Sequence, residues 1–326
     1  MSQLPPSLLQ SIMANALSAP PLPSSAGAMW VYVIKRFQAF STNLDLTPAQ
    51  LSEGRKKFEG VVSCLNTAYF GTASTTDNAF FIGSWAKDTH IRPPRDVDLY
   101  FILPLSVYQR YEAYGGWINK QSALLQEVKG KLLASFPRSD IKGDGPVVMA
   151  AFDSYNVEIV PAFRYDDKEV SYYVCDTKNG GSYKKTMPWH EVAEIKGADS
   201  RNNSNVRPLI RMLKCWQAYC SVPIKSFYLE LLAVEFLDQW AYRLQSYYFY
   251  DWMCRDFFAW MTGKANSFLN APGTFELLWL GDDWKSRAES AYGRAAKACD
   301  FERVNDMASA GTEWQKVFGL NIPKYV

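Results

Sequence analysis

The most constraining feature of this sequence is a Gly-Ser pair followed, after a basic loop containing prolines, by two closely spaced aspartates. Gly83 and Ser84 come directly after the apolar residues 79–82, and Asp96 and Asp98 begin a second apolar run. In a β-strand, residues two apart point to the same face, so we expect the two carboxylates to project side by side. Carboxylates this close repel each other unless a cation lies between them, and Mg²⁺ prefers a few carboxylates together with substrate phosphates. The Gly-Ser turn offers backbone N–H groups and a hydroxyl to phosphate oxygens. The alternative is a surface loop whose aspartates only cap a strand.

A third carboxylate lies within a later apolar run. The pattern predicts two strands, at residues 147–152 and 156–160, joined by a tight turn. Glu158 lies in the second strand, among apolar neighbours. Burying a carboxylate without a partner is costly, so Glu158 either has a partner or points to solvent. The residues alone leave both alternatives open.

A basic triplet lies on a predicted helix at residues 205–220. Arg207, Arg211 and Lys214 follow an i, i+4, i+7 spacing and therefore share one face of that helix. Such a triplet usually forms a solvated basic face, although the rest of this helix is apolar. Both a solvated face and an anion-binding face remain open.

Local patterns predict the other elements. A capping box at residues 47–50, with proline at the first helical position, predicts a helix to about Phe70. The spacing of apolar residues predicts one helix over 107–136. Residues 166–205 are polar and are predicted to form a crossover between two lobes, and the chain after residue 205 is almost wholly helical by pattern. Two further predictions concern the N-terminal region: short helices at 7–17 and 30–40, and an extended linker at 19–25.

Composition excludes several classes of protein. The chain has 326 residues, 48% of them hydrophobic and 21% charged, which is typical of a globular protein large enough for two lobes. The formal net charge is only +2, which disfavours a polymerase that holds long nucleic acid or a protein drawn to anionic membranes. We find no signal-peptide pattern and no long apolar span, so we expect a cytoplasmic protein without a membrane partner.

The Gly-Ser pair joined to Asp-x-Asp resembles the active-site signature of the DNA polymerase β-like nucleotidyltransferases. The stretch GSWAKDTHIRPPRDVDLYF, residues 83–101, resembles in particular the cGAS/DncV-like nucleotidyltransferases (CD-NTases) of bacterial CBASS anti-phage defence. This resemblance covers residues 80–230 by motif and the remainder by helical character. It implies an α+β, bilobed, polymerase β-like fold. The catalytic lobe, with a mixed β-sheet and N-terminal helices, would span residues 1–204, and the C-terminal helical lobe residues 205–326.

The resemblance also implies roles for individual residues. Asp96, Asp98 and Glu158 would be the catalytic residues and would hold two Mg²⁺ ions, with Mn²⁺ as an alternative. Glu158, where the family often has Asp, would lie next to the attacking 3′- or 2′-hydroxyl. Gly83 and Ser84 would bind substrate phosphate.

Two motifs in the helical part are similar to family segments that contact the nucleotide. Residues 209–216 resemble a segment that supplies a lysine to the β- and γ-phosphates, a role that falls on Lys214 with Arg211 as its helper. Residues 225–230, Lys-Ser-Phe-Tyr-Leu-Glu, resemble a second motif in which Ser226 would bind a phosphate oxygen. Phe227 or Tyr228 would stack on a base, or else fill the core.

The function implied is Mg²⁺-dependent synthesis of a cyclic di- or trinucleotide second messenger from nucleoside triphosphates. ATP is the first candidate substrate, followed by GTP or others, and the product would act on a separate effector protein. Two alternatives remain. One is a template-independent terminal nucleotidyltransferase acting on RNA or a small molecule, and the other is a non-catalytic nucleotide sensor on the same scaffold.

Overall fold

The computed structural model describes residues 31–115, 118–166, 168 and 170–326. The helix predicted at 7–17 and the linker predicted at 19–25 lie outside these residues. By its internal contacts the chain divides into two compact units. The sheet unit comprises residues 45–196 and 270–276, and the helical unit comprises the described residues up to Leu44 together with 197–269 and 277–326. The predicted division into a catalytic lobe over residues 1–204 and a helical lobe over residues 205–326 remains a prediction.

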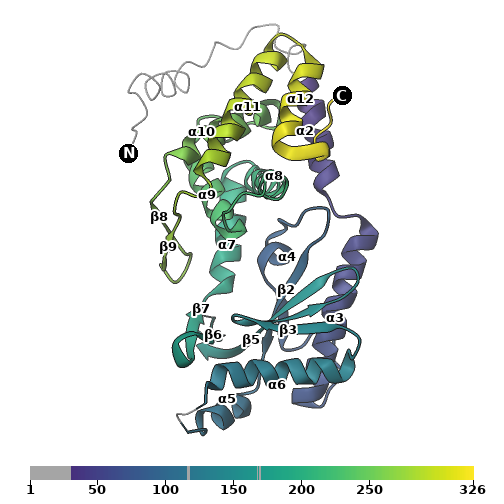
Figure 1. Ribbon diagram of the computed structural model, residues 1–326, viewed down its shortest axis with the longest axis vertical. Coiled ribbons are helices and arrows are strands. Elements are labelled where there is room, and N and C mark those ends of the chain that lie inside the picture. Colours follow the sequence, from purple (N-terminus) through teal and green to yellow (C-terminus); the bar gives the residue numbers. More distant parts are fainter. Residues whose placement is uncertain (1–30, 116–117, 167, 169) are drawn as a thin grey trace. The chain divides into compact units, whose positions relative to one another are not determined.

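The sheet unit contains a mixed β-sheet, which has seven strands within the described part of the chain (Figure 1). These strands are β1 (Ala79–Phe81), β2 (Asp96–Ile102), β3 (Asp140–Asp144), β4 (Val147–Ala151), β5 (Asn156–Asp166), β6 (Ser171–Asp176) and β7 (Ser182–Thr186). Their order is β1-β2-β5-β4-β3, with β6 pairing with the second half of β5 and β7 with β6. The β2 and β5 strands are parallel, and the other described pairs in this sheet are antiparallel. The predicted strands at 147–152 and 156–160 are therefore present as β4 and β5.

One face of the two parallel strands is fully apolar. Val97, Leu99 and Ile159 have no exposed surface. They form one hydrophobic cluster with residues of α3 (Pro48–Phe70) and α6 (Lys120–Ser135), the helices that contact β2 and β4. Because side chains alternate along a strand, the residues between these apolar positions lie on the opposite face.

The predicted capping box at the start of α3 is confirmed. The Thr47 hydroxyl oxygen accepts a hydrogen bond from the Gln50 backbone N–H at 3.2 Å, and Gln50 Oε1 accepts one from the Thr47 N–H at 2.9 Å. Pro48 is the first helical residue, and the helix ends at Phe70. Gly71 follows in the left-handed conformation, with φ of 68°, which glycine adopts without strain.

The prediction of one helix over residues 107–136 is wrong. This region forms two helices, α5 (Leu105–Glu112) and α6. The second begins anew after Asn119, whose side chain accepts a hydrogen bond from the Ser122 N–H at 2.9 Å. An N-cap residue has non-helical backbone angles, so the helix is broken at Asn119. The spacing of apolar residues does not reveal this break, because it continues from one helix into the next.

The boundary between the two units falls after Lys196, within the predicted crossover over residues 166–205, but this region is more regular than its polar composition suggested. This region contains β6, β7 and the helix α7 (Pro188–Arg201). Tyr172 and Val174 lie in β6, and such aromatic and β-branched residues favour strands. Val174 pairs with Ala162 of β5 in an antiparallel pair, which fixes this segment as a strand of the sheet.

The helical unit consists mainly of helices that follow α7 in the sequence. They are α8 (Val206–Tyr219), α9 (Ser226–Gln239), α10 (Tyr250–Thr262), α11 (Lys285–Arg303) and α12 (Met307–Phe318), joined by the N-terminal helix α2 (Val31–Leu44). A two-stranded hairpin, β8 (Phe268–Asn270) and β9 (Leu277–Trp279), interrupts the predicted helical run. The short helical segments in the two units are α4 (Gly83–Lys87), η1 (Lys178–Gly180), η2 (Tyr247–Phe249) and η3 (Gly319–Asn321). Across the part of the chain that the structure describes, no helix is long and apolar enough to cross a bilayer.

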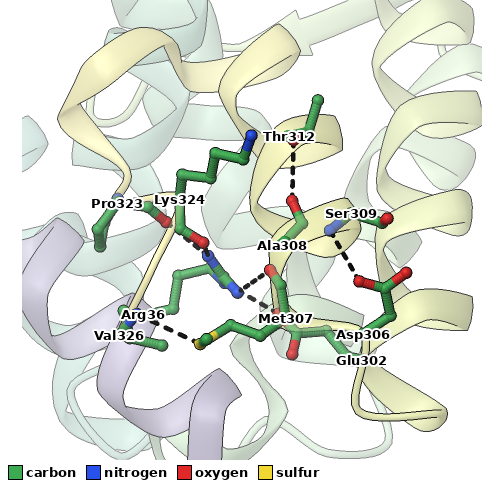
Figure 2. A network of polar contacts seen from close by, with 10 residues as sticks. All are labelled: Arg36, Glu302, Asp306, Met307, Ala308, Ser309, Thr312, Pro323, Lys324 and Val326. Carbon is green, nitrogen blue, oxygen red and sulfur yellow. Dashed lines mark hydrogen bonds and ion pairs between the residues drawn. The ribbon is translucent and has the colours of Figure 1, made fainter.

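A fully buried arginine connects α2 to the end of the chain (Figure 2). Arg36 Nε lies 2.9 Å from Glu302 Oε1, and the same guanidinium donates hydrogen bonds to the backbone carbonyls of Met307, Pro323 and Lys324. A buried arginine is stable only when its charge and its N–H donors find partners, and this network supplies both. Arg36 therefore links three separate segments of the helical unit.

Candidate functional site

The three predicted catalytic carboxylates lie on one face of β2 and β5. In the parallel pairing, Asp98 is opposite Glu158 and Asp96 is opposite Asn156. All three carboxylate residues are half-buried. The residues that alternate with them are buried on the opposite face: Val97, Leu99, Val157 and Ile159. Adjacent strands are about 4.8 Å apart, so the backbones of Asp98 and Glu158 are close neighbours. Tertiary pairing thus brings Glu158 beside the Asp-x-Asp motif.

The Asp96 residue is held through both its side chain and its backbone. Asp96 Oδ1 accepts a hydrogen bond from Asn156 Nδ2 at 3.1 Å, across the two parallel strands. The Asp96 carbonyl oxygen accepts one from the indole Nε1–H of Trp85, also at 3.1 Å. These contacts leave the second carboxylate oxygen of Asp96 outside both hydrogen bonds.

The Gly83 residue is required by its backbone angle and by its closeness to Asp98. Its φ is +55°, a conformation that L side chains rarely adopt. A Cβ atom at this position would collide with Oδ2 of Asp98. The backbone N–H of Ile82 also donates to the Asp98 carbonyl at 3.0 Å. The predicted Gly-Ser turn therefore opens α4, in direct contact with a predicted catalytic residue, and Ser84 follows in a half-buried position.

A buried lysine joins this signature segment to α7. Lys87, on α4, is 3% exposed, and its Nζ lies 2.9 Å from Glu191 Oε2. Tyr100 lies two residues after Asp98 on β2 and therefore on the same face of the sheet. Its hydroxyl forms a hydrogen bond of 3.1 Å with Thr186 Oγ1. Burial raises the pKa of Tyr100 to about 12. The face of β2 that carries Asp96 and Asp98 therefore also carries a tyrosine, and its hydroxyl stays protonated at neutral pH.

The positions of the donor atoms decide whether a divalent ion could bind at this site. Among the residues that the structure describes, no three His, Cys, Asp or Glu side chains form a group that could hold a metal ion. The backbone register is nevertheless suitable, because it places three carboxylate-bearing residues on one face of two adjacent strands. Carboxylate oxygens are the ligands that Mg²⁺ prefers. The residue types and the register are therefore those that a Mg²⁺ site requires, although the side chains of these described residues are not themselves gathered into such a site.

The remaining predicted site residues all belong to the helical unit. Lys214 and Arg211 lie on α8, and Ser226 and Phe227 lie at the start of α9. Arg211 is half-buried and donates a hydrogen bond to the Ser41 carbonyl at 3.4 Å. Phe227 is half-buried as well. The structure thus groups Gly83, Ser84 and the three carboxylates in the sheet unit, and the other four residues in the helical unit.

The side chains of Lys214 and Ser226 each have a partner across the α8–α9 pair. Lys214 Nζ lies 2.7 Å from Glu230 Oε1, and both residues are buried. The Ser226 hydroxyl donates to Gln217 Oε1 at 2.8 Å. Contacts between the two helices therefore hold both predicted phosphate ligands in place.

Sequence reasoning assigned no role to four residues that contact predicted site residues within their own unit: Trp85 and Asn156 in the sheet unit, and Gln217 and Glu230 in the helical unit. A signal for Asn156 was present, because it precedes Glu158 by two residues and so shares its face of the strand. Its alignment with Asp96 depends on the register between β2 and β5, which no local pattern specifies.

The fold matches that of solved CD-NTase structures, which confirms the predicted α+β architecture with a mixed sheet and C-terminal helices. One of them is the structure of CdnC from Escherichia coli MS115-1 with ATP. It has a TM-score of 0.61 and 18% sequence identity to this chain, over 89% of this chain and 98% of that one.

The family comparison is more specific. The family described as Second Messenger Oligonucleotide or Dinucleotide Synthetase domain (SMODS) matches residues 32–199, just over half of the chain. The chain therefore belongs to the SMODS family, and the predicted relationship to the CD-NTases is confirmed at that level.

Curated relatives are distant. A probable cyclic nucleotide synthase of Bacillus cereus (strain VD146) is 23% identical in an alignment 277 residues long, and the match covers 74% of this chain and 81% of that protein. The CBASS oligonucleotide cyclase CdnC of Escherichia coli (strain KTE188) is 26% identical over 162 residues, 48% of this chain and 49% of that protein. A CCA-adding enzyme of Pyrococcus abyssi is 32% identical over 161 residues, 48% of this chain but only 32% of that protein.

Proposed function

We propose that this protein is a Mg²⁺-dependent nucleotidyltransferase that joins nucleoside triphosphates into a cyclic di- or trinucleotide second messenger for CBASS signalling. The observation that carries the proposal is the register of β2 with β5, which aligns Asp98 with Glu158 and puts Asp96 on the same face. A binding module has no need for three carboxylates in this arrangement. The cyclase relatives from Bacillus and Escherichia support the choice of product.

Within this proposal, Asp96, Asp98 and Glu158 would hold two Mg²⁺ ions, or Mn²⁺ in their place, and these ions would supply the charge that stabilises the attacking and leaving oxygens. Glu158 would lie next to the attacking 3′- or 2′-hydroxyl. Gly83 allows the chain to approach Asp98, and Ser84 would donate its hydroxyl to a substrate phosphate.

The helical unit would provide the remaining phosphate ligands. A triphosphate carries several negative charges, and Lys214 would neutralise part of that charge through a charge-assisted hydrogen bond. Ser226 and Arg211 would add further donors, and Phe227 would stack on a base. ATP is the first candidate substrate because the similar structure of CdnC was solved with ATP. GTP and the other nucleotides are further candidates, and the product would act on a separate effector in the cytoplasm.

A second function is favoured by one observation, the identity of 32% over 161 residues with a CCA-adding enzyme. That resemblance supports a template-independent terminal transferase acting on RNA. The match covers about a third of the CCA-adding enzyme, so we rank this function below the cyclase.

The test is to incubate the purified chain with all four nucleoside triphosphates and Mg²⁺, treat the mixture with phosphatase, and analyse it by mass spectrometry. We expect a phosphatase-resistant product at the mass of a cyclic di- or trinucleotide. The D96N/D98N variant should make none, whereas the control D140N, which removes an exposed carboxylate on β3, should make as much as the wild type. Extension of added RNA would favour the terminal transferase. Nucleotide binding without turnover would indicate a non-catalytic sensor.

A further inference from the structure

Trp85 joins the Gly-Ser segment to the start of β2. It is the residue after Ser84 on α4, and its indole Nε1–H donates a hydrogen bond to the Asp96 carbonyl oxygen at 3.1 Å. This bond spans the whole basic loop between α4 and β2. It therefore connects the backbone of Asp96, a predicted metal ligand, to the segment that carries Gly83 and Ser84, which are predicted to bind phosphate.

The Trp85 ring is held by aromatic neighbours on several sides. It stacks on Phe81 at 5.4 Å between ring centroids and on His90 at 5.3 Å, and Tyr155 meets it edge-on at 6.1 Å. Tyr155 in turn donates its hydroxyl hydrogen to the Gln50 carbonyl of α3 at 2.8 Å. Such stacked and edge-on contacts restrict the orientation of the ring and hence the direction of its N–H.

The α3 helix makes room for this ring with a glycine. Gly54 is buried within α3, where glycine weakens a helix relative to alanine. A Cβ atom at Gly54 would collide with Cη2 and Cζ2 of Trp85. Gly60, on the same helix, is different, because its nearest neighbour would be Phe136 Cζ at 3.9 Å. The helix therefore lacks a side chain where the Trp85 ring needs the space.

We propose that Trp85 is a positioning residue that sets the backbone of Asp96, so that its carboxylate is presented to the divalent ion, and that Gly54 provides the space for Trp85. Asn156 orients the Asp96 side chain from β5, and Trp85 anchors its main chain from α4. The inference rests on the proposed function, because it takes Asp96 to be a metal ligand.

The experiment measures Mn²⁺ binding to the full-length, nucleotide-free protein by electron paramagnetic resonance, independently of turnover. W85F keeps an aromatic ring but loses the N–H, and we expect it to bind Mn²⁺ about fivefold more weakly, the loss of one net hydrogen bond. The matched control is W284F. Trp284 is buried in the helical unit, where its Nε1–H donates to the Leu280 carbonyl at 3.0 Å. W284F should lower the melting temperature to a similar extent and leave Mn²⁺ affinity unchanged.

A second pair of variants tests the space that Gly54 provides. G54A should push the Trp85 ring out of place and weaken Mn²⁺ binding at least as much as W85F does. G60A, on the same helix, should bind Mn²⁺ like the wild type. Wild-type Mn²⁺ affinity in both W85F and G54A would overturn the proposal, as would an equal loss in W284F or G60A.

The D96N variant separates this inference from the proposed function. We expect D96N to lose most Mn²⁺ binding. If it does, and W85F still binds Mn²⁺ like the wild type, the metal assignment stands and only the role of Trp85 is rejected. If D96N binds Mn²⁺ like the wild type, Asp96 is not a ligand and both proposals are overturned.

Discussion

Lys214 Nζ lies 2.7 Å from Glu230 Oε1, and the two side chains are only 9% and 5% exposed. Removing one partner of a buried ion pair is strongly destabilising, whereas replacing both with apolar residues of similar volume is often tolerated. This difference allows the structural role of Lys214 to be separated from its proposed role in nucleotide binding.

The first prediction concerns this pair. E230Q should lower the free energy of unfolding by about 3 kcal/mol, because Lys214 loses its carboxylate partner. The double variant K214M/E230M should recover most of that stability in urea denaturation. It should nevertheless have a KM for ATP raised about tenfold, because a charged hydrogen bond to phosphate is missing. A double variant with wild-type KM would show that Lys214 does not bind the triphosphate.

The second prediction concerns Gly83. Alanine at this position is strained by the positive φ and collides with Asp98, so G83A should lose activity by about 100-fold through displacement of that carboxylate. Gly71 is the matched control, since it has a similar φ of +68° and no atom near its would-be Cβ. Both variants should be less stable by about 1 kcal/mol, and only G83A should be impaired in nucleotide turnover. Equal activities in the two variants would contradict the role assigned to Gly83.

The third prediction concerns Arg36. R36M should destabilise the protein by more than about 3 kcal/mol, because Glu302 loses its buried partner. R36M/E302M should recover only part of this loss, since the carbonyls of Met307, Pro323 and Lys324 still lack their donor (Figure 2). Urea unfolding of the three proteins measures both differences. Full recovery in the double variant would mean that the carbonyl contacts contribute little.

The fourth prediction concerns Asp251, which is fully buried in the helical unit. Burial raises the pKa of Asp251 from 3.8 to about 7, and the nearby Glu302 carboxylate acts in the same direction. Between pH 4 and 7 the Asp251 carboxyl is protonated in the folded state and ionised in the unfolded chain. The free energy of unfolding that this difference contributes is therefore complete below pH 4 and is lost as the pH rises to 7.

Urea denaturation of the wild type and of D251N at several pH values tests this behaviour. The stability of the wild type relative to D251N should fall by up to about 1.4 kcal/mol per pH unit between pH 4 and 7 and then stay constant. A difference that does not change with pH would contradict the raised pKa.

Some predictions from sequence were correct because the interactions that determine them are local. The capping box at Thr47 is completed within four residues, and Asp96 and Asp98 share a face because of the geometry of a single strand. Other predictions failed where the local signal was incomplete. The helical periodicity of residues 107–136 continues across the N-cap at Asn119, and the aromatic and β-branched residues of β6 were outweighed by the polar residues around them.

The candidate site shows the same division. The amino-acid sequence by itself determined the candidate signature, because Gly83, Ser84, Asp96 and Asp98 lie in one short segment with a recognisable spacing. Only the tertiary structure decided that Glu158 lies beside Asp98, that Asn156 and Trp85 hold Asp96, and that Glu230 pairs with Lys214. The physical reason is that strand register, helix pairing and aromatic packing are set by contacts between residues far apart in sequence. The free energy of those contacts depends on the whole fold rather than on any local pattern.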